Sequence, residues 1–332
     1  YKRQIIMKPR EKHDFTPEKD FLYDSIIIGG GVAGLSSAMY ASRMGLKVLV
    51  VAENLGGTIA LTHVVENYPG FVSISGQKLA DAITNHAKDY DIDILNKKVE
   101  KVSKSAENKG YVVKTEGGNF KGKTVLFSTG SKWRKLNVPG EKDFENKGVS
   151  YCALCDGPLF QDKIVGVVGG ADSAVKEGLL LTKYAKKVYI IYRGEKVHPE
   201  PITMERAEEA IKSGKLEIIN NTNVTEIRGE TFLTHVILDR PYKDSKEFKL
   251  DGLFIYIGHI PFSDLAKDLG VELNKKGEII INRNSETNLP GIYAAGDVAD
   301  SKFKQAITGV AEGVTAAYNI HEYIASSFRS EK

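Results

Sequence analysis

Residues 23–34 read YDSIIIGGGVAG, an apolar run that leads directly into a glycine-rich turn. Residues 25–28 have the β-branched character of a buried parallel strand, and residues 35–43 are small and helical in character. Residues 47–51 predict a second strand. A strand, a G-x-G-x-x-G turn and a helix in this order form a binding site for a dinucleotide pyrophosphate. We therefore expect an α/β chain that begins with such a site.

The glycines of this turn have separate roles. Gly29 permits the tight turn, Gly31 lets a pyrophosphate approach the backbone, and Gly34 lets the helix pack against the strand. N–H groups at the helix start then donate to the anion. An acidic residue after the second strand holds a ribose hydroxyl in such sites. Glu53 fits this role, or the position next to it, Ala52.

A second arrangement of the same kind follows later in the chain. Residues 163–168 predict a strand, GGADSA at 169–174 opens a helix that continues through 175–180, and residues 187–192 predict the next strand. Ala171 stands where a glycine gives pyrophosphate its closest approach. Its methyl group is either tolerated with a small shift or excludes the ligand. This half binds a nicotinamide dinucleotide or is a Rossmann-type domain kept for its packing.

Both cysteines of the chain lie in VSYCALCDG, residues 149–157. A structural disulfide across so short a loop would stabilise little, because the entropic gain grows with loop length. A zinc site within one chain would need further ligands, and no second CxxC or HxxxH is present. A redox-active pair is favoured over a structural disulfide and over a metal site shared between subunits.

The length of 332 residues predicts about two domains. The net charge of +3 is small, and acidic and basic residues alternate, which argues against nucleic acid as a partner. The scattered histidines suggest no metal site. No run of about 18 apolar residues occurs, so we expect neither export nor a membrane span, and hence a cytoplasmic protein. Residues 1–22 are interpreted as a polar extension.

Residues 288–297 read NLPGIYAAGD and predict another strand, which ends in Gly-Asp. The carboxylate of Asp297 would accept a sugar hydroxyl of a cofactor that lies across the sheet edge. The alternative is a surface turn that caps the next helix.

With these motifs in order, the chain resembles the low-molecular-weight thioredoxin reductase family of flavoprotein disulfide reductases from residue 23 to about residue 324. Relatives of the lipoamide dehydrogenase type carry their cysteine pair in the first helix of the FAD domain, whereas this pair lies in the second dinucleotide domain. The motifs that carry the resemblance are GGGVAG (29–34), VENYPG (65–70), STG (128–130), CALCD (152–156), GGADSA (169–174), IGHIP (257–261), AAGDV (294–298) and KQAIT (304–308).

The resemblance implies two Rossmann-like domains of the three-layer ββα type. A discontinuous FAD-binding domain would comprise residues 23–131 and 252–325, with an NAD(P)-binding domain at 132–251 inserted into it. Hinges would lie near residues 131–132 and 250–251. Members of the family are homodimers that hold FAD noncovalently and swivel the inserted domain.

By similarity, Cys155 contacts the flavin, Cys152 attacks the disulfide of the protein substrate, and Asp156 carries a proton between thiol and flavin. Asp156 is otherwise a turn carboxylate. The residues expected at the FAD site are Gly29, Gly31, Ala33, Gly34, Ala52, Glu53, Gly56, Gly57, Thr58, Asn67, Asp297, Lys304, Gln305 and Ala306. Those expected at the nicotinamide site are Gly169, Ala171, Asp172, Ser173, Ala174 and Arg193.

The sequence departs from the family in the nicotinamide half. Members that use NADPH carry His-Arg-Arg after the second strand and another arginine four residues on, which neutralise the 2′-phosphate. Here Arg193 remains, but Gly194 and His198 replace two arginines. Each lost charge-assisted contact is worth about 1.5–3 kcal/mol. NADPH, NADH and another reductant therefore all remain open as the electron donor. At the flavin site, Thr58 replaces a frequent glutamine and Lys304 an arginine.

Three functions follow. The leading prediction is a disulfide reductase for thioredoxin or a glutaredoxin-like protein. The second is an NAD(P)H oxidase in which reduced FAD passes electrons to dioxygen. The third is a disulfide reductase or flavin-bearing redox sensor whose nicotinamide site has decayed and whose electrons come from another donor.

Overall fold

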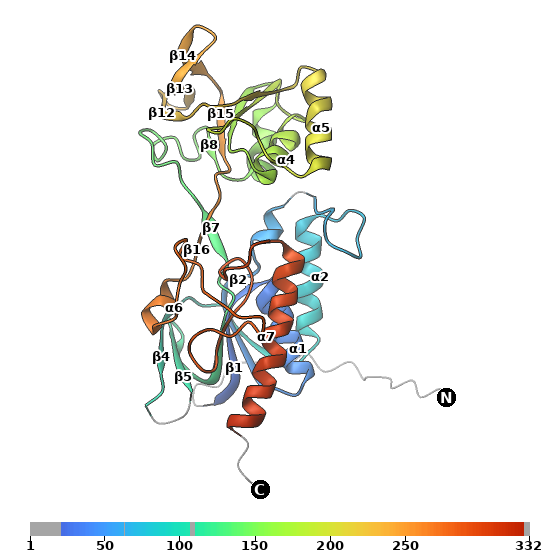
Figure 1. Cartoon of the computed structure of the whole chain (residues 1–332), viewed down its shortest axis with the longest axis vertical. Coiled ribbons are helices and arrows are strands. Elements are labelled where there is room, and N and C mark those ends of the chain that lie inside the picture. The colour runs from blue at the N-terminus through green and yellow to red at the C-terminus, as the bar shows by residue number, and fades with distance from the viewer. Residues whose placement is uncertain (1–20, 63, 107–109, 329–332) are drawn as a thin grey trace, which may run out of the picture. The chain divides into compact units, whose positions relative to one another are not determined.

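The computed structural model describes residues 21–62, 64–106 and 110–328, drawn in Figure 1. The chain forms two compact units: the first runs up to Lys132 and resumes at Pro261, and the second is Trp133–Ile260. The second unit ends at residue 260 rather than at the expected 251, because strand β15 (Gly252–Ile255) pairs inside it with β9 (Ile164–Val168). Most of the expected extension 1–22 lies outside the described residues. Its last residue, Leu22, is the first residue of β1.

In the first unit, a sheet with the strand order β3-β2-β1-β6-β5-β4 carries the glycine-rich turn, and β17 pairs with β6. Strands β1, β2, β3 and β6 are parallel, whereas β4, β5 and β6 form an antiparallel meander. The bounds are β1 (Leu22–Gly31), β2 (Val48–Gly56), β3 (Ile92–Leu95), β4 (Val99–Lys104), β5 (Tyr111–Thr115), β6 (Gly118–Phe127) and β17 (Ile292–Ala294).

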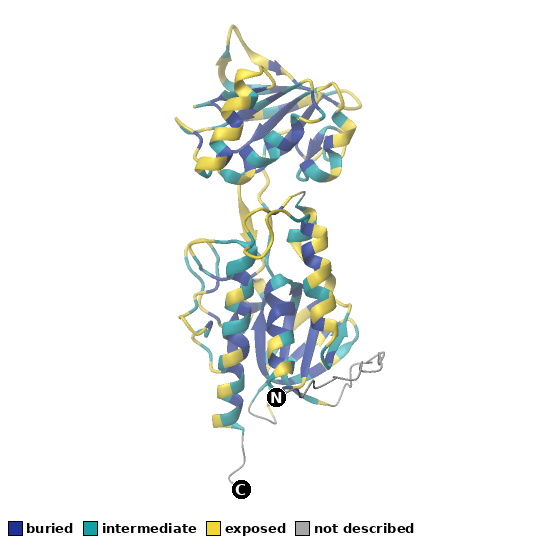
Figure 2. Cartoon of the chain, turned by 90° about the vertical axis from the view of Figure 1, so that its right-hand side faces the viewer, coloured by how far each residue is buried: buried dark blue, intermediate teal, exposed yellow. Residues whose placement is uncertain are grey.

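Helices cover one face of this sheet and the meander lies toward the other. Leu35 and Ala38 of α1 and Ala316 and Ile320 of α7 are fully buried with the residues of one sheet face. Val113 and Phe120 of the meander belong to the core on the opposite side. Figure 2 shows the buried strands behind helices whose outer faces are exposed. The bounds are α1 (Val32–Arg43), η1 (Thr58–Leu61), α2 (Gly76–Lys88), α6 (Asp264–Leu269) and α7 (Ala306–Ser327).

The second unit repeats this three-layer plan on a smaller scale. Its parallel sheet has the order β11-β10-β9-β15-β8, and the antiparallel strands β12, β13 and β14 form a separate layer. The core contains α4 and α5 residues on one side and residues of β12–β14 on the other. The bounds are β8 (Val149–Ser150), α3 (Ala153–Asp156), η2 (Gly157–Phe160), α4 (Asp172–Leu181), β10 (Lys187–Ile191), α5 (Pro201–Lys212), β11 (Leu216–Ile219), β12 (Val224–Gly229), β13 (Leu233–Tyr242) and β14 (Ser245–Lys249).

The two connecting segments pair with each other. Strand β7 (Ser131–Trp133) and strand β16 (His259–Pro261) form a two-stranded sheet. The N–H of Arg134 donates to the carbonyl of Gly258 at 2.9 Å. The first connection between the units lies at residues 132–133 and the second at residues 260–261, whereas hinges are expected near residues 131–132 and 250–251.

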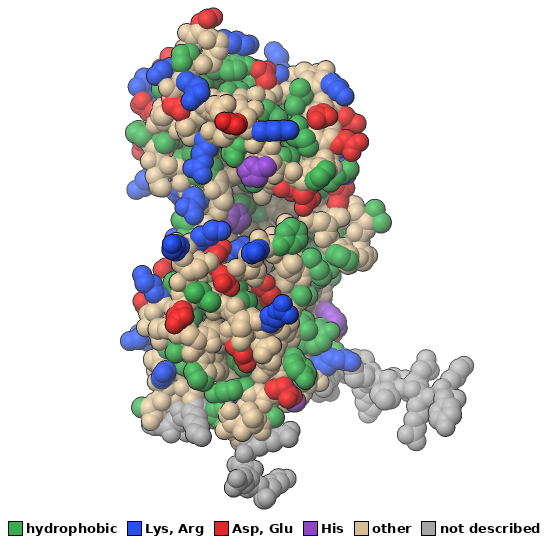
Figure 3. Space-filling view, viewed as in Figure 1, with side chains coloured by type: hydrophobic (Ala, Val, Ile, Leu, Met, Phe, Trp, Pro, Cys, Tyr) green, Lys and Arg blue, Asp and Glu red, His purple; other side chains and the backbone are tan. Residues whose placement is uncertain are grey.

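No helix in the described part of the chain is both long and apolar enough to cross a bilayer. Figure 3 shows lysine, arginine, aspartate and glutamate side chains intermingled over the visible face. This mixing agrees with the small net charge of +3.

Candidate redox site and dinucleotide cradles

The two cysteines form a disulfide around one short helical turn. Cys152 and Cys155 are bonded, with their Cα atoms 5.3 Å apart. Cys152 is the N-cap of α3, and the N–H of Cys155 donates to the Cys152 sulfur at 3.1 Å. Cys155 is exposed, whereas Cys152 is partly buried. The disulfide is therefore accessible to solvent within its own unit.

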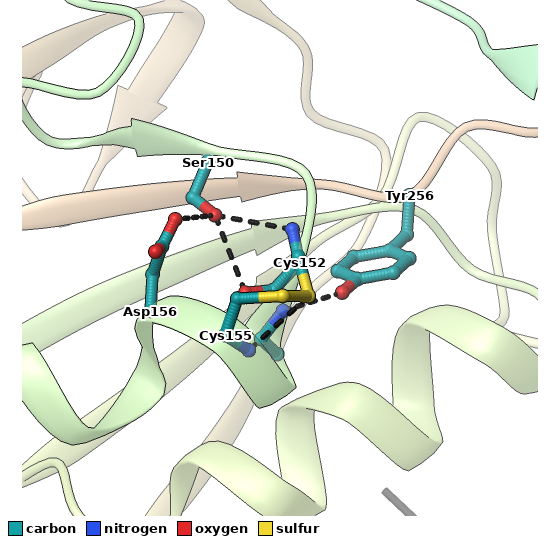
Figure 4. Close-up of a disulfide and its surroundings, with 6 residues drawn as sticks. Ser150, Cys152, Cys155, Asp156 and Tyr256 are labelled. Carbon is teal, nitrogen blue, oxygen red and sulfur yellow. Dashed lines mark hydrogen bonds between the residues drawn. A yellow bond between two sulfur atoms is a disulfide. The ribbon is translucent and has the colours of Figure 1, made fainter. Parts of the chain in front are cut away.

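Ser150 connects Asp156 to the backbone of Cys152 (Figure 4). Its hydroxyl donates to the Asp156 carboxylate, with Oγ and Oδ2 2.6 Å apart, and accepts the N–H of Cys152 at 3.1 Å. Ser150 is 5% exposed. The carboxylate that the sequence places beside the cysteines is thus held by a buried hydroxyl from β8. No sequence pattern indicated this role of Ser150.

Tyr256, which follows β15, contacts the other side of the turn. The N–H of Ala153 donates to its hydroxyl, with N and Oη 2.7 Å apart. In Figure 4 the hydroxyl points toward the cysteine turn. The ring packs edge-on against Trp133, with ring centroids 5.6 Å apart, and Trp133 packs edge-on against His259 at 4.5 Å. Burial, together with the charges of Glu177 and Asp156, raises the pKa of Tyr256, so its hydroxyl stays neutral.

Glu177 of α4 is a partly buried acidic group near this site. Its Oε2 has no contact with solvent and no hydrogen-bond partner among the described residues. Burial raises the pKa of Glu177 to about 7, and the nearby Lys176 opposes this rise only in part. Glu177 therefore changes protonation near neutral pH, which no sequence motif indicated.

The glycine-rich turn at residues 29–34 forms the first cradle for a dinucleotide. It has the geometry that the sequence predicts for its three glycines. A Cβ on Gly29 would lie 2.2 Å from the carbonyl oxygen of Ser128, and one on Gly34 would lie 2.1 Å from that of Gly29. A Cβ on Gly31 would meet only the Cα of Gly57, at 3.7 Å. The tight packing at two glycines and the open space at Gly31 fit a dinucleotide pyrophosphate at the start of α1.

Gly57 is a predicted FAD residue that borders this open space. Gly57 faces Gly31, because a Cβ on Gly57 would lie 2.7 Å from the Cα of Gly31. Glu53 is exposed and Ala52 is buried, both within β2, which continues to Gly56. Thr58 is exposed at the start of η1. The side chain of Ala33 instead faces α7 and the turn after β17, since it would lie 3.8 Å from a Cβ on Gly309 and 3.1 Å from one on Gly296.

The start of α7 joins two predicted residues that are far apart in sequence. The side-chain amide of Asn67 donates to Oε1 of Gln305 at 3.0 Å. Gln305 is the N-cap of α7 and forms a capping box with Thr308, so Ala306 begins the helix. These contacts place the loop around Asn67 beside the N-terminus of α7.

Lys304 holds the turn that carries Asp297. Its ammonium donates to the carbonyl oxygens of Asp297 at 2.7 Å and of Ala299 at 2.5 Å, and pairs with Glu278 at 2.9 Å. An ammonium has three N–H donors, and these partners engage all of them. From α7, Glu312 accepts the N–H of Gly296 at 2.7 Å. Lys304 and Glu312 therefore set the position of Asp297, and neither role was evident from the sequence.

The turn at residues 169–174 forms the second cradle. It is built in the same way, but neighbouring residues cover more of it. A Cβ on Gly169 would lie 2.2 Å from the Tyr256 carbonyl oxygen, and one on Gly170 would lie 2.3 Å from the ring of Tyr192. Ala171 is exposed as the N-cap of α4. It pairs with His198, whose N–H donates to the carbonyl of Gly170 at 2.7 Å. The segment after β10 thus returns across the cradle.

Asp172 is engaged by its neighbours. Its carboxylate accepts the N–H of Glu200 at 2.9 Å and pairs with Lys176 at 2.6 Å. Burial alone would raise the pKa of Asp172, but the hydrogen bonds from Lys176 and Glu200 outweigh it and lower the pKa. Its charge is therefore balanced at the helix start. Ser173 and Arg193 are exposed, and Ala174 is buried.

The strand registers of the two cradles make Arg193 the counterpart of Glu53. Ile28 pairs with Val51 in the first sheet, and Val168 pairs with Ile191 in the second. Glu53 and Arg193 each follow the paired residue by two positions. An acidic side chain at this position suits a ribose hydroxyl, and a cationic one suits a 2′-phosphate. The second cradle therefore carries a cationic side chain at the position where the first carries an acidic one.

A model of the pyridine nucleotide-disulphide oxidoreductase family matches residues 23–313, which include both cradles and the disulfide. The chain belongs to the pyridine nucleotide-disulphide oxidoreductase family. It is 39% identical over 306 residues to the thioredoxin reductase of Bacillus subtilis, covering 91% of this chain and 95% of the relative. It is 34% identical to an NADH dehydrogenase of the same organism, covering 91% of this chain but 58% of that longer protein.

The fold is also similar to that of solved thioredoxin reductases. The crystal structure of Lactococcus lactis thioredoxin reductase matches with a TM-score of 0.86 and 34% identity, covering 91% of this chain and 99% of that one. The expected family and the α/β fold with two dinucleotide-binding domains are confirmed. These similarities show that this oxidoreductase is a flavoprotein disulfide reductase that uses FAD and NAD(P)H.

Proposed function

We propose that this oxidoreductase reduces the disulfide of thioredoxin or a glutaredoxin-like protein, with electrons that pass from NAD(P)H through FAD to the Cys152–Cys155 pair. The single observation that carries the proposal is the accessible disulfide on α3, which has Asp156 at the end of the same turn. The similarity to B. subtilis thioredoxin reductase over 95% of that protein supports the substrate class.

The two cofactors are assigned to the two cradles. The first unit would hold FAD at the cradle around Gly31, between the start of α1 and the turn of Asp297. The second unit would hold the nicotinamide dinucleotide at the start of α4, with Arg193 beside its ribose. The flavin supplies two electrons, one pair for each disulfide reduced. Residues of the chain carry out the remaining steps, which are disulfide exchange and proton transfer.

Disulfide exchange then follows from the arrangement of the cysteines. Two electrons and two protons convert the Cys152–Cys155 disulfide to two thiols. The Cys152 thiolate attacks one sulfur of the substrate disulfide, a mixed disulfide forms, and the other substrate sulfur leaves as a thiolate. Cys155 then attacks the Cys152 sulfur, which releases the reduced substrate and restores the pair. The N–H of Cys155, 3.1 Å from the Cys152 sulfur, favours the thiolate at Cys152.

Asp156 is the proposed proton carrier of the site. Its carboxylate lies in the cysteine turn and accepts the hydroxyl of Ser150. One oxygen is thus fixed, and the carboxylate remains within its turn to take a proton from a thiol or return one. Asp156→Asn keeps the shape of the side chain and removes this capacity. We expect slower reduction of the substrate with unchanged flavin content.

Anaerobic titration of the flavoprotein with NADPH and then NADH tests the donor. Because Arg193 is the counterpart of Glu53, we expect flavin bleaching at lower concentrations of NADPH than of NADH. The missing cations at Gly194 and His198 weaken that preference. If neither nucleotide bleaches the flavin even in large molar excess over the enzyme, the assignment of the second cradle is wrong.

Reduction of insulin through added thioredoxin tests the substrate class. Wild-type protein with NAD(P)H should precipitate insulin only when thioredoxin is present, and Cys152→Ser and Cys155→Ser should each abolish the reaction. An NAD(P)H oxidase would instead consume oxygen at the same rate in the wild type and in Cys152→Ser, without thioredoxin. That result would favour the oxidase over the reductase.

We also infer a cytoplasmic homodimer from the family resemblance. Light scattering at micromolar concentration tests the dimer, and cell fractionation tests the compartment. A monomeric flavoprotein with full activity would contradict the first inference, and recovery from a membrane or secreted fraction would contradict the second.

A further inference from the structure

The redox turn is too short to hold its own shape. Helix α3 has one turn, Ala153–Asp156, and a single turn is not stable without outside contacts. Two side chains from outside the turn supply them. Ser150 of β8 accepts the N–H of Cys152, and Tyr256 accepts the N–H of Ala153. Two further contacts lie inside the turn: the N–H of Cys155 donates to the Cys152 sulfur at 3.1 Å, and the N–H of Asp156 donates to the carbonyl of Cys152 at 3.0 Å.

We propose that Tyr256 is a positioning residue for disulfide exchange: its hydroxyl fixes the peptide between Cys152 and Ala153 and thereby keeps the N–H of Cys155 directed at the Cys152 sulfur. This inference rests on the proposed function, since the Cys152 thiolate is the group that attacks the substrate. Tyr256 lies 103 residues from Ala153 in sequence, so no motif around the cysteines indicates it.

Burial makes this hydrogen bond decisive for the turn. Ala153 is fully buried, so its N–H has no access to water when the tyrosine hydroxyl is removed. The N–H of the first helical residue also has no acceptor within the helix. The peptide must then rotate to find another acceptor, and Cys152 moves with it. The Cys152 sulfur loses its alignment with the N–H of Cys155, and its thiolate loses a stabilising donor.

The ring of Tyr256 is supported independently of its hydroxyl. Its edge-on contact with Trp133 and its place in the core of the second unit involve the ring alone. Tyr256→Phe therefore removes the hydrogen bond and retains the packing. Tyr242 provides a matched control in the same unit, because its hydroxyl donates to Glu217 and its ring packs against Phe248.

Among the described residues, three other titratable groups lie around Tyr256. Asp156 lies in the same turn, Glu177 on α4 acts on Tyr256, and His259 packs against Trp133. Because Glu177 changes protonation near pH 7, its contribution is separated by repeating the measurement with Glu177→Gln.

The experiment uses the flavin-loaded protein with Cys155→Ser, which leaves Cys152 as the single thiol of the chain and keeps the backbone N–H of residue 155. The rate of iodoacetamide alkylation is measured between pH 5 and 10. With Tyr256→Phe we expect the midpoint to rise by about one pH unit and alkylation at pH 7 to slow about tenfold, equivalent to about 1.4 kcal/mol. Tyr242→Phe should leave the profile unchanged.

An unchanged profile with Tyr256→Phe overturns the proposal, as does an equal shift with Tyr242→Phe. Loss of the Tyr256-dependent shift in the Glu177→Gln background would assign the effect to the carboxyl group and also overturn it. Emission of Trp133, the single tryptophan of the chain, verifies that the ring environment is retained.

Hydrogen exchange gives a test that needs no substitution at Tyr256. The Ala153 amide of the Cys155→Ser protein should exchange at least 100-fold more slowly than in an unstructured peptide, and exchange at the unstructured rate refutes the inference. Neither measurement involves thioredoxin or NAD(P)H. Failure of the proposed function would therefore leave these two results intact, and failure of the inference would leave insulin reduction intact.

Discussion

Substitution of Gly31 by alanine should separate cofactor binding from folding. The backbone at Gly31 has φ −78° and ψ −176°, which alanine adopts without strain. The added methyl group would meet only the Cα of Gly57, at 3.7 Å. Alanine is a poorer N-cap than glycine, but it also reduces the entropy of the unfolded chain by about 0.4–1 kcal/mol. We expect the free energy of unfolding of the FAD-free protein to change by less than about 1 kcal/mol.

The FAD affinity should fall much more. The methyl group occupies the open side of the cradle, where a pyrophosphate approaches the N–H groups at the start of α1. A hydrogen bond to a charged group contributes about 1.5–3 kcal/mol, so loss of one bond weakens FAD binding by about ten- to a hundredfold. Flavin absorbance relative to protein absorbance, and titration of the FAD-free protein with FAD by flavin fluorescence, measure this loss.

Gly34→Ala is the matched control. Its methyl group would lie 2.1 Å from the carbonyl oxygen of Gly29 and 2.5 Å from Oγ of Ser128, so α1 must move away from β1. We expect destabilisation of several kcal/mol in urea unfolding, beyond the ordinary cost of about 1–3 kcal/mol for overpacking. Wild-type FAD affinity in Gly31→Ala, or unfolding of Gly31→Ala under conditions where Gly34→Ala stays folded, would refute the reasoning.

Three further predictions concern charged residues. Because the pKa of Glu177 is raised to about 7, the folded state keeps a proton that the unfolded state loses above about pH 4.5. The free energy of unfolding of the wild type should therefore fall by about 1–3 kcal/mol between pH 4.5 and pH 7 and then level off. The urea midpoints of Glu177→Gln should not show this fall. Lys304→Met leaves Glu278 without its cation and leaves two carbonyl oxygens, including that of Asp297, without their donor. Urea unfolding should show that the free energy of unfolding falls by about 2–3 kcal/mol. An unchanged midpoint would mean that these contacts do not stabilise the fold. Arg193→Ala should weaken NADPH binding about tenfold in stopped-flow flavin reduction and leave NADH binding nearly unchanged, and an equal effect on both nucleotides would place Arg193 away from the 2′-phosphate.

Of the two domain boundaries, the sequence indicates the first but not the second. The first boundary is apparent because residues 131–133 follow a completed strand, β6. The second is not, because residues 252–255 are an apolar run that fits either sheet equally well. Their pairing with β9 assigns them to the second unit. A parallel strand is apolar on both faces, so its sequence does not tell which neighbours it will have.

Local sequence determined the two glycine-rich cradles and the cysteine turn, because a tight turn, a helix start and a CxxC loop each depend on residues within a few positions of one another. Tertiary structure alone decided which groups hold these sites in place. Ser150 is close in sequence to Asp156, but nothing in the pattern gives the direction of its hydroxyl. Tyr256 reaches Ala153 across 103 positions, and Asn67 reaches Gln305 across 238. Hydrogen bonds act over about 3 Å, so such contacts exist only after the chain has folded and brought distant segments together.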